Sequence, residues 1–309
     1  MTKNFNKIDL NFKVHICVPT FKENKYVFKF INCLVKSTFK NWILYIVNAY
    51  PEDKLELKIL EKYSDFSNKI ILIKGNEDEY WSESVNRGLH KIKESYDSKD
   101  KLIIANVDSS FSNNLLDNLI SNHNDKIQLA CVSVNEKNKV IKSGIKVKSW
   151  LLAYNEHLMV NKQIDQVNKT MMRVDFLPIS FVIFPIGIIN KDFFIDSKYL
   201  PHYGGDYAYS LLLNSKGYKS FIDFSSIVKN SEENTGYCVY RKNIKLIERI
   251  KNLFSIKNPS SLRHRFWLVM KYYPQYSKPT ALFSYFLRSL LETLLGGKNI
   301  IYLKKVFNL

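Results

Sequence analysis

Short apolar runs alternate with longer stretches of mixed polar and apolar residues over residues 13–134. The runs contain few polar residues, which is typical of strands buried on both faces of a parallel sheet. In the stretches between them, apolar residues recur at helical spacing. The expected strands are 14–18, 43–47, 70–73, 102–105 and 129–134, and the expected helices are 26–35, 55–60, 82–92 and 113–123. This order predicts an α/β fold around a mostly parallel central sheet.

The pattern changes after Ser133, where the alternation of strands and helices becomes less regular. The expected elements are short strands or a hairpin around Gly144 within 139–154, a polar loop over 155–170, strand character over 173–184, a helix over 204–216 and a strand over 220–224. Pro178 interrupts the strand character, since proline cannot donate a hydrogen bond to a neighbouring strand. We therefore expect one α/β domain over 13–240 with two unlike halves, 13–134 and 135–240.

Positive charge is concentrated at the C-terminal end of the chain. The net charge is +17, and residues 241–309 hold 14 Lys and Arg against Glu248 and Glu292. This segment is rich in aromatic residues and has an apolar stripe at helical spacing, formed by Leu282, Phe286, Leu290 and Leu294. It predicts a basic, amphipathic helical extension that lies on an anionic membrane surface. The alternative is a helix that packs its stripe on the preceding domain.

Other bulk features narrow the class of protein. No DNA- or RNA-binding motif accompanies the positive charge, so no nucleic-acid partner is expected. The longest apolar run, 176–189, is too short to span a bilayer, and residues 1–9 hold no apolar signal segment. The cysteines show no paired spacing, which indicates core thiols in a reducing compartment: Cys17, Cys33, Cys131 and Cys238. We expect a cytoplasmic protein, peripheral on the inner face of the cytoplasmic membrane.

Polar residues follow the expected strands at their carboxyl ends. Thr20, Asn48, Asn106 and Asp108 stand at such positions. In an open parallel sheet these ends meet along one crevice, which is where ligands bind. A carboxylate such as that of Asp108 suits a hard cation that holds a diphosphate. The alternative for Asp108 is a helix cap, and for Thr20 and Asn48 it is a structural turn.

A second candidate carboxylate stands about a hundred residues later. Asp206 follows Gly204 and Gly205 at the start of an expected helix. The glycines allow the backbone to approach a substrate closely, and a helix start favours the ionised carboxylate that a base requires. A simple helix cap is the alternative reading. Together, Asp108 and Asp206 indicate sugar transfer from a nucleotide-activated donor.

Five segments occur in the order found in family 2 glycosyltransferases: 17–21, 44–53, 81–88, 106–109 and 201–219. The chain resembles this family over residues 13–240, which implies the nucleotide-sugar-binding fold often called GT-A. It is most similar to the bacterial branch of rhamnosyl- and other cell-surface-glycan transferases. That branch carries a tryptophan-rich segment ending in Asn-x-Gly and a Pro-His-Tyr segment before an Asp-Tyr pair. Here these are 80–88 and 201–207, and 255–274 is also similar to the branch's C-terminal extension.

The resemblance implies a role for each half of the domain. Residues 13–134 would bind the donor, a UDP-, dTDP- or GDP-linked sugar, and 135–240 would face the acceptor, a glycan or lipid-linked glycan of the bacterial surface. The enzyme would be an inverting, metal-dependent hexosyl or deoxyhexosyl transferase that uses Mg²⁺ or Mn²⁺. Asp108 matches the metal-contacting acid and Asp206 the catalytic base. Further matches are Thr20, Asn48, Trp81, Asn86 and Asn106 on the donor side, and His202, Gly204 and Gly205 on the acceptor side.

The chain also departs from the family pattern. Asn48 and Asn106 stand where many relatives carry acids, and Asn230 stands near the place of a histidine that completes some metal sites. Ala208 and Leu212 replace an acid and an arginine. A relative that binds a nucleotide or glycan without turnover is therefore the alternative function. For Asn86 and Trp81 the alternatives are a satisfied helix amide and core packing.

Overall fold

The computed structural model describes residues 12–168, 170–230 and 245–306 of the chain. Its first half alternates strands with helices, as the sequence predicts. The elements are β1 (Val14–Thr20), α1 (Asn24–Lys36), β2 (Trp42–Asn48), η1 (Pro51–Asp53), α2 (Leu55–Lys62), η2 (Ser64–Phe66), β3 (Ile70–Lys74), α3 (Trp81–Lys93), β4 (Lys101–Ala105), β5 (Ser110–Phe111), α4 (Leu115–Asn122) and β6 (Ile127–Val134). Every strand and helix expected over this half is present, with bounds that differ by a few residues.

The second half contains shorter strands and the C-terminal helices. Its elements are β7 (Val140–Lys142), β8 (Ile145–Ser149), β9 (Tyr154–His157), η3 (Ile164–Gln166), β10 (Met171–Arg173), β11 (Phe181–Pro185), α5 (Gly187–Asn190), α6 (Gly205–Ser215), β12 (Lys219–Lys229), α7 (Leu246–Asn252), α8 (Leu262–Tyr272), η4 (Gln275–Ser277) and α9 (Lys278–Val306). The expected boundary near residue 240, the N-terminal residues 1–9 and Cys238 lie outside the described residues.

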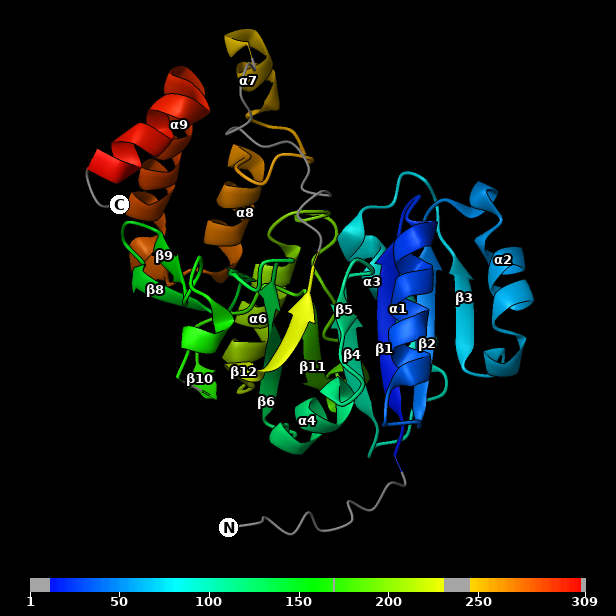
Figure 1. Cartoon of the computed structure of the whole chain (residues 1–309). Helices are drawn as coiled ribbons and strands as arrows, with labels where there is room; N and C mark the ends of the chain where they lie inside the picture. Colours follow the sequence, from blue (N-terminus) through cyan, green and yellow to red (C-terminus); the bar gives the residue numbers. More distant parts are fainter. Residues whose placement is uncertain (1–11, 169, 231–244, 307–309) are drawn as a thin grey trace.

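The main sheet has the strand order β10-β12-β6-β11-β4-β1-β2-β3, with β5 paired to β12 and β7 paired to β6 (Figure 1). Strands β4, β1, β2 and β3 are parallel to their neighbours in this series, and β12 is parallel to β6. Strand β11 runs antiparallel between β4 and β6 and joins the two parallel groups into one sheet. The α/β fold with its mostly parallel centre is thus confirmed.

Strand β1 extends two residues beyond the end expected from Pro19. On one side β1 pairs with β4 only as far as Cys17, whereas on the other side it pairs with β2 through Thr20. The missing N–H of proline is tolerated because the strand has become a one-sided edge at that point. This extension places Thr20 at the carboxyl edge of the sheet.

Of the two alternatives left open around Gly144, short strands are confirmed, because β7 and β8 flank this residue, whereas a hairpin with its turn at Gly144 is wrong. The hairpin pairs β8 with β9, and its turn lies over 150–153, so β9 occupies the start of the stretch expected to be a loop. The β9 sequence Tyr-Asn-Glu-His has no apolar alternation, so its pattern gave no strand signal. Gly144 instead lies between β7 and β8, where a Cβ would be 2.5 Å from Val174 Cγ1.

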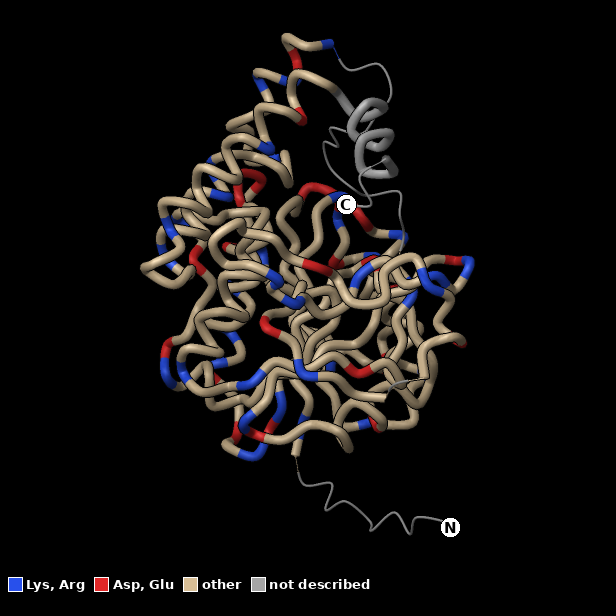
Figure 2. The backbone as a smooth tube through the Cα atoms, turned by 90° about the vertical axis from the view of Figure 1, so that its left-hand side faces the viewer, with Lys and Arg blue, Asp and Glu red and all other residues tan. Residues whose placement is uncertain are grey.

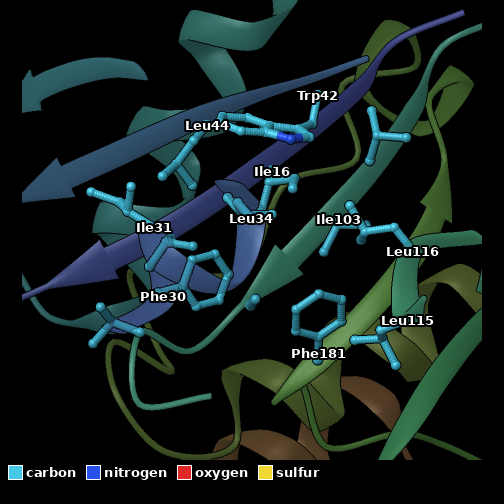
Figure 3. Close-up of a cluster of buried hydrophobic side chains, with 14 of the residues drawn as sticks. Ile16, Phe30, Ile31, Leu34, Trp42, Leu44, Ile103, Leu115, Leu116 and Phe181 are labelled. Atoms are coloured by element: carbon cyan, nitrogen blue, oxygen red, sulfur yellow. The ribbon is translucent and has the colours of Figure 1, made fainter. Parts of the chain in front are cut away.

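Helices cover both faces of the sheet with separate hydrophobic clusters. On one face, α1, α2 and α4 pack against the central strands around large buried side chains such as Phe30, Trp42 and Phe181 (Figure 3). On the other face, α3, α5 and α6 pack over Tyr45, Ile104 and Phe184. Cys17 and Cys131 are buried in these clusters and Cys33 is partly buried, and all three are free thiols. This agrees with the expectation of core thiols for the described cysteines.

The C-terminal helices pack on the second half of the domain. Leu268 and Val269 of α8, Tyr273 directly after it, and Ala281 and Tyr285 of α9 share a third hydrophobic cluster with residues of α6 and the β8–β9 turn. The helical prediction for this extension is therefore confirmed over its described part. Of the predicted leucine stripe, Leu282 packs against this cluster, whereas Phe286, Leu290 and Leu294 are exposed. Within the described residues, no helix has the length and apolar character needed to cross a membrane.

Candidate active site

Two polar side chains lie at the carboxyl ends of adjacent central strands. Thr20 ends β1 and Asn48 ends β2; they are paired in register, and each is 4% exposed. The Thr20 hydroxyl has no hydrogen-bond partner among the described residues. Both polar atoms of the Asn48 amide are used by its own loop, because Nδ2 donates to Asp53 Oδ1 at 2.9 Å and Oδ1 accepts from the Tyr50 N–H at 3.0 Å. Thr20 thus has a buried hydroxyl without a protein partner at the end of β1, whereas Asn48 shapes the loop.

The loop that follows β4 is held from two sides. Asn106 Oδ1 accepts from the indole Nε1–H of Trp81, the first residue of α3, at 3.2 Å. Asp108 Oδ1 accepts from Nδ2 of Asn230, the residue after β12, at 3.0 Å. Asn230 also donates to Ser109 Oγ at 2.9 Å. Asn106 and Asp108 both remain partly exposed, so the loop is fixed while its polar side chains stay accessible to a ligand.

Asp206 lies in the first turn of α6, where two glycines set the backbone. Gly204 has a φ of 79°, the left-handed region that favours glycine. Gly205 has no room for a side chain, because a Cβ would lie 2.3 Å from Ser82 Oγ and 2.9 Å from Leu200 O. The two glycines thus allow α6 to start directly against α3, which brings Asp206 to the carboxyl edge of the sheet.

The N-terminus of α3 connects the Asp108 loop with the Asp206 turn. Trp81 binds Asn106 on the donor side. Ser82 binds the opposite segment, because its N–H donates to Pro201 O at 2.9 Å and its hydroxyl donates to Leu200 O at 2.6 Å. Two consecutive residues of one helix therefore hold both carboxylate-bearing segments, which are far apart in the sequence. This contact places the two candidate carboxylates at the same edge of the sheet.

The surroundings of Asp206 change its acidity. Burial raises its pKa to about 6, while hydrogen bonds from the Tyr207 and Ile179 N–H groups and the charge of Lys142 act in the opposite direction. The Tyr207 N–H lies 2.9 Å from Asp206 Oδ1. A carboxyl group with this pKa is mostly ionised at pH 7 and is a stronger base than an ordinary aspartate. Asp206 can therefore accept a proton at neutral pH.

Aromatic rings and histidines form the rim next to Asp206. The His202 ring lies 5.7 Å from that of Tyr80 and 4.5 Å from that of Tyr203, and Tyr203 lies 6.0 Å from His264 of α8 (centroid distances). Burial lowers the pKa of His202 to about 4, with smaller effects from His264 and Lys257. His202 is therefore neutral at physiological pH. Through His264, the C-terminal helices reach the rim of the site.

Asn86 of α3 faces the segment around Ile195 and not the loops at the carboxyl edge of the sheet. Its Nδ2 donates to Ile195 O at 2.8 Å, and its Oδ1 accepts from the Ile195 N–H at 2.9 Å. It is 7% exposed. This arrangement is that of a satisfied helix amide, which was the alternative open for Asn86. Its contribution to the site is to hold the segment before Pro201 against α3.

Several residues of the site were not expected from the sequence. Ser82 fixes both Leu200 and Pro201, but a serine in a helix is too common to stand out. The positive charge of Lys142 of β7 acts to lower the pKa of Asp206. Tyr207 OH lies 3.4 Å from His157 Nε2 of β9. These contacts depend on the path of the second half of the chain, so local pattern could not reveal them.

The donor side fits a hard divalent cation. Asp108 supplies a carboxylate, and Asn230 Oδ1 is a buried oxygen with no hydrogen-bond partner among the described residues. Among those residues no group of three or more His, Cys, Asp or Glu could hold a metal. Cations such as Mg²⁺ often use one or two carboxylates together with substrate phosphates. The residues present therefore fit a cation that shares its ligands with a bound diphosphate.

The sheet order, the helices on both faces and the polar carboxyl edge define a GT-A type nucleotide-sugar transferase fold. Residues 15–197 match the family model described as glycosyl transferase family 2. The chain belongs to this family, whose members transfer sugars. A comparison with curated protein sequences gave no match.

Solved structures with the same fold are distant in sequence. Mannosyltransferase PcManGT from Pyrobaculum calidifontis, in complex with GDP-Man and Mn²⁺, is 12% identical with a TM-score of 0.52, and the match covers 89% of this chain and 70% of that one. TarS 1-349 from S. aureus is 13% identical with a TM-score of 0.52 and the same coverages. GalNAc-T7 with UDP, GalNAc and Mn²⁺ is 10% identical with a TM-score of 0.57, covering 78% of this chain and 48% of that one. At these identities the likeness establishes the fold.

Proposed function

We propose that the chain is an inverting glycosyltransferase that moves a sugar from a nucleoside diphosphate sugar to an acceptor hydroxyl. The observation that carries this proposal is the N-terminus of α3, which holds the Asp108 loop through Trp81 and the Asp206 turn through Ser82. This leaves one carboxylate for each side of a bound sugar. On this proposal residues 13–134 would bind the donor and residues 135–240 would face the acceptor.

Asp206 would act as the general base. The acceptor oxygen forms a bond to the anomeric carbon as the bond from that carbon to the diphosphate oxygen breaks, and the hydroxyl proton moves to Asp206. Burial raises the pKa of Asp206 to about 6, which leaves it ionised but basic at neutral pH. Gly204, Gly205 and the neutral His202 would form the acceptor side next to this carboxylate.

The donor side would be built from Asp108 and its neighbours. Asp108 and Asn230 would hold Mg²⁺ or Mn²⁺, which when bound neutralises the negative charge of the leaving diphosphate. Thr20 has a free hydroxyl for the nucleotide, while Asn48, Asn106 and Trp81 shape the pocket around it. Mn²⁺ and a GDP sugar in the PcManGT structure, and UDP-GlcNAc in a TarS structure, support this class of donor.

The finer substrate assignment rests on the motifs of the sequence. The Trp-rich segment 80–88 and the Pro-His-Tyr segment 201–207 favour a hexosyl or deoxyhexosyl donor linked to UDP, dTDP or GDP. The acceptor would be a bacterial surface glycan, such as lipopolysaccharide or capsule, or its lipid-linked precursor. The protein would act in the cytoplasm at the inner face of the membrane, with residues 241–309 as the contact.

The two carboxylates can be tested separately. Asp206→Asn should abolish transfer of a labelled sugar while nucleotide binding, measured by calorimetry, is retained. Asp108→Asn should weaken Mn²⁺-dependent nucleotide binding at least tenfold. Asp65→Asn, an exposed carboxylate of η2, is the matched control and should change neither quantity. Turnover by Asp206→Asn equal to that of the unmodified protein would remove Asp206 from the mechanism.

A second candidate function is binding without turnover. The specific observation in its favour is that Asn48 and Asn106 are neutral and that both already bond to neighbouring protein groups. Calorimetry with nucleoside diphosphates and Mn²⁺, followed by a donor-hydrolysis assay, separates the candidates. Binding without hydrolysis or transfer across a panel of nucleotide sugars would favour the binding protein.

A further inference from the structure

Helix α9 presents a broad apolar face away from the rest of the protein. Its exposed side chains recur at helical spacing, and they are Phe283 (68%), Phe286 (51%), Leu287 (44%), Leu290 (38%), Leu291 (45%) and Leu294 (54%). The face extends for roughly 17 Å, at about 1.5 Å per residue. Phe286, Leu290 and Leu294, from the stripe predicted by the sequence, belong to it. Leu282, the first residue of that stripe, packs against the third hydrophobic cluster, so the helix uses only this end of the stripe to pack on the domain.

The opposite face of α9 makes the contacts with the protein. Its buried line consists of Ala281, Tyr285, Ser289 and Thr293, which are small or polar residues. Arg265 of α8 donates to Ser289 Oγ and lies 3.5 Å from Glu292, and its guanidinium lies 5.1 Å from the Tyr285 ring centroid. The inward face is thus satisfied by specific contacts. The outward apolar face is not explained by folding of the chain.

The turn of the β8–β9 hairpin adjoins this face. Leu151 and Leu152 are 46% and 60% exposed. Arg288 of α9 donates to Leu152 O at 2.6 Å and to Ala153 O at 2.9 Å, and Ser284 Oγ donates to Leu152 O at 2.8 Å. On a helix, Ser284 and Arg288 are direct neighbours of Leu287 and Leu291. The exposed leucines of the turn therefore extend the apolar face of α9 onto the acceptor half of the domain.

Charge indicates what this surface meets. Residues 241–309 carry 14 Lys and Arg against two acids, and one of the acids, Glu292, already faces Arg265. Helix α7 lies beside the C-terminal part of α9 through the Arg249–Leu294 contact. Lys251 of α7 and Lys245 at its N-cap are exposed, as is Glu248, the other acid of the segment. Figure 2 views the molecule from this side, with Lys and Arg along the projecting helices. A second copy would bring like charges together, whereas anionic lipid offers the opposite charge.

We propose that the outer face of α9 and the 150–153 turn form one docking surface for an anionic lipid bilayer. The helix lies in the plane of the interface, with its apolar side chains among the acyl chains and the lysines of α7 at the headgroups. This inference specifies the membrane contact of the proposed function. It rests on that function only for the idea that docking brings the enzyme to its acceptor. The turn and α6, which carries Asp206, both belong to the acceptor half (Figure 1). Docking through the turn therefore orients this half of the domain toward the bilayer.

Vesicle sedimentation of the full chain tests the surface. The probe is a set of phosphatidylcholine vesicles with and without about 30% phosphatidylglycerol, which gives the surface a negative potential. We expect binding to the anionic vesicles that falls with salt. Replacing Leu287, Leu290 and Leu291 by Ser should reduce the partition coefficient at least tenfold, and Leu151→Ser with Leu152→Ser should reduce it several-fold.

The chain offers a matched control in Leu57 and Leu60 of α2, which are 63% and 50% exposed but lie at the opposite end of the sheet. Their replacement by Ser should leave vesicle binding unchanged. Unchanged binding by the α9 variant would overturn the proposal. A dimer in light scattering that the α9 variant converts to a monomer, without vesicle binding, would overturn it in favour of self-association. Nucleotide binding measured without vesicles reports on the proposed function separately.

Discussion

Asp206→Asn should make the folded protein more stable at neutral pH. The pKa of Asp206 is raised to about 6 in the folded protein, against 3.8 for an ordinary aspartate, and burial is the main cause. The folded state therefore holds this proton more tightly than the unfolded chain, and ionisation costs stability as pH rises from about 4 to about 6. The pKa difference corresponds to about 2 to 3 kcal/mol, once partial exposure is allowed for. Asparagine removes this cost and can still accept from the Tyr207 N–H.

Urea unfolding at pH 8, pH 6 and pH 5 measures the effect. At pH 8 the free energy of unfolding of the variant should exceed that of the unmodified protein by about 2 to 3 kcal/mol. At pH 5 the gain should fall to about half, because folded Asp206 is still mostly protonated at that pH. Comparing two proteins at each pH cancels all other titrating groups. The Asp65→Asn control should show no such trend. A variant that is less stable at pH 8, or a gain that does not change with pH, would refute the reasoning.

Three further substitutions test contacts around the site and the core. Gly205→Ala should lower the unfolding free energy by about 1 to 3 kcal/mol, since its Cβ would meet Ser82 and Leu200; an unchanged thermal midpoint would contradict this. Asn230→Ala should weaken Mn²⁺-dependent nucleotide binding roughly tenfold in calorimetry, because Asp108 loses its donor; equal affinity would show that Asn230 does not position Asp108. Asp100→Ala should cost about 2 to 4 kcal/mol in urea unfolding, because buried donors such as His15 Nε2, 2.8 Å away, lose their acceptor; a loss under about 1 kcal/mol would speak against it.

The first half of the fold was predictable because its strands are buried on both faces. Runs such as 43–47 and 102–105 have no polar face, so their position and parallel character follow from the sequence and the helices between them. The same topology correctly placed Thr20, Asn48 and the Asn106–Asp108 loop at one edge. What this reasoning could not give is which polar atoms remain free. The contacts of Asn48 with Asp53 and Tyr50 are made within a loop whose path has no periodic signal.

The second half was less predictable because contacts between residues distant in the sequence decide the direction of its strands and the orientation of its helices. The strand character expected over 173–184 gives no direction, and β11 runs antiparallel between β4 and β6. Likewise, the period of the α9 leucines predicts a helix but not which face turns inward. Arg265, Arg288 and Tyr285 settle that orientation through contacts with α8 and the hairpin turn. Periodicity identifies a helix, whereas the partners of its polar residues decide how it is turned.

The neutral residues on the donor side change how a cation would be bound rather than whether it can be. Among Asn48, Asn106, Asp108 and Asn230, Asp108 carries the carboxylate, so the protein contributes little charge for a free ion. A diphosphate brings several anionic oxygens, and Mg²⁺ commonly takes part of its ligands from substrate phosphates. Affinity for the cation should therefore depend on the nucleotide being present. The asparagines are then compatible with turnover, because the charge they lack is supplied by the donor that the enzyme must bind in any case.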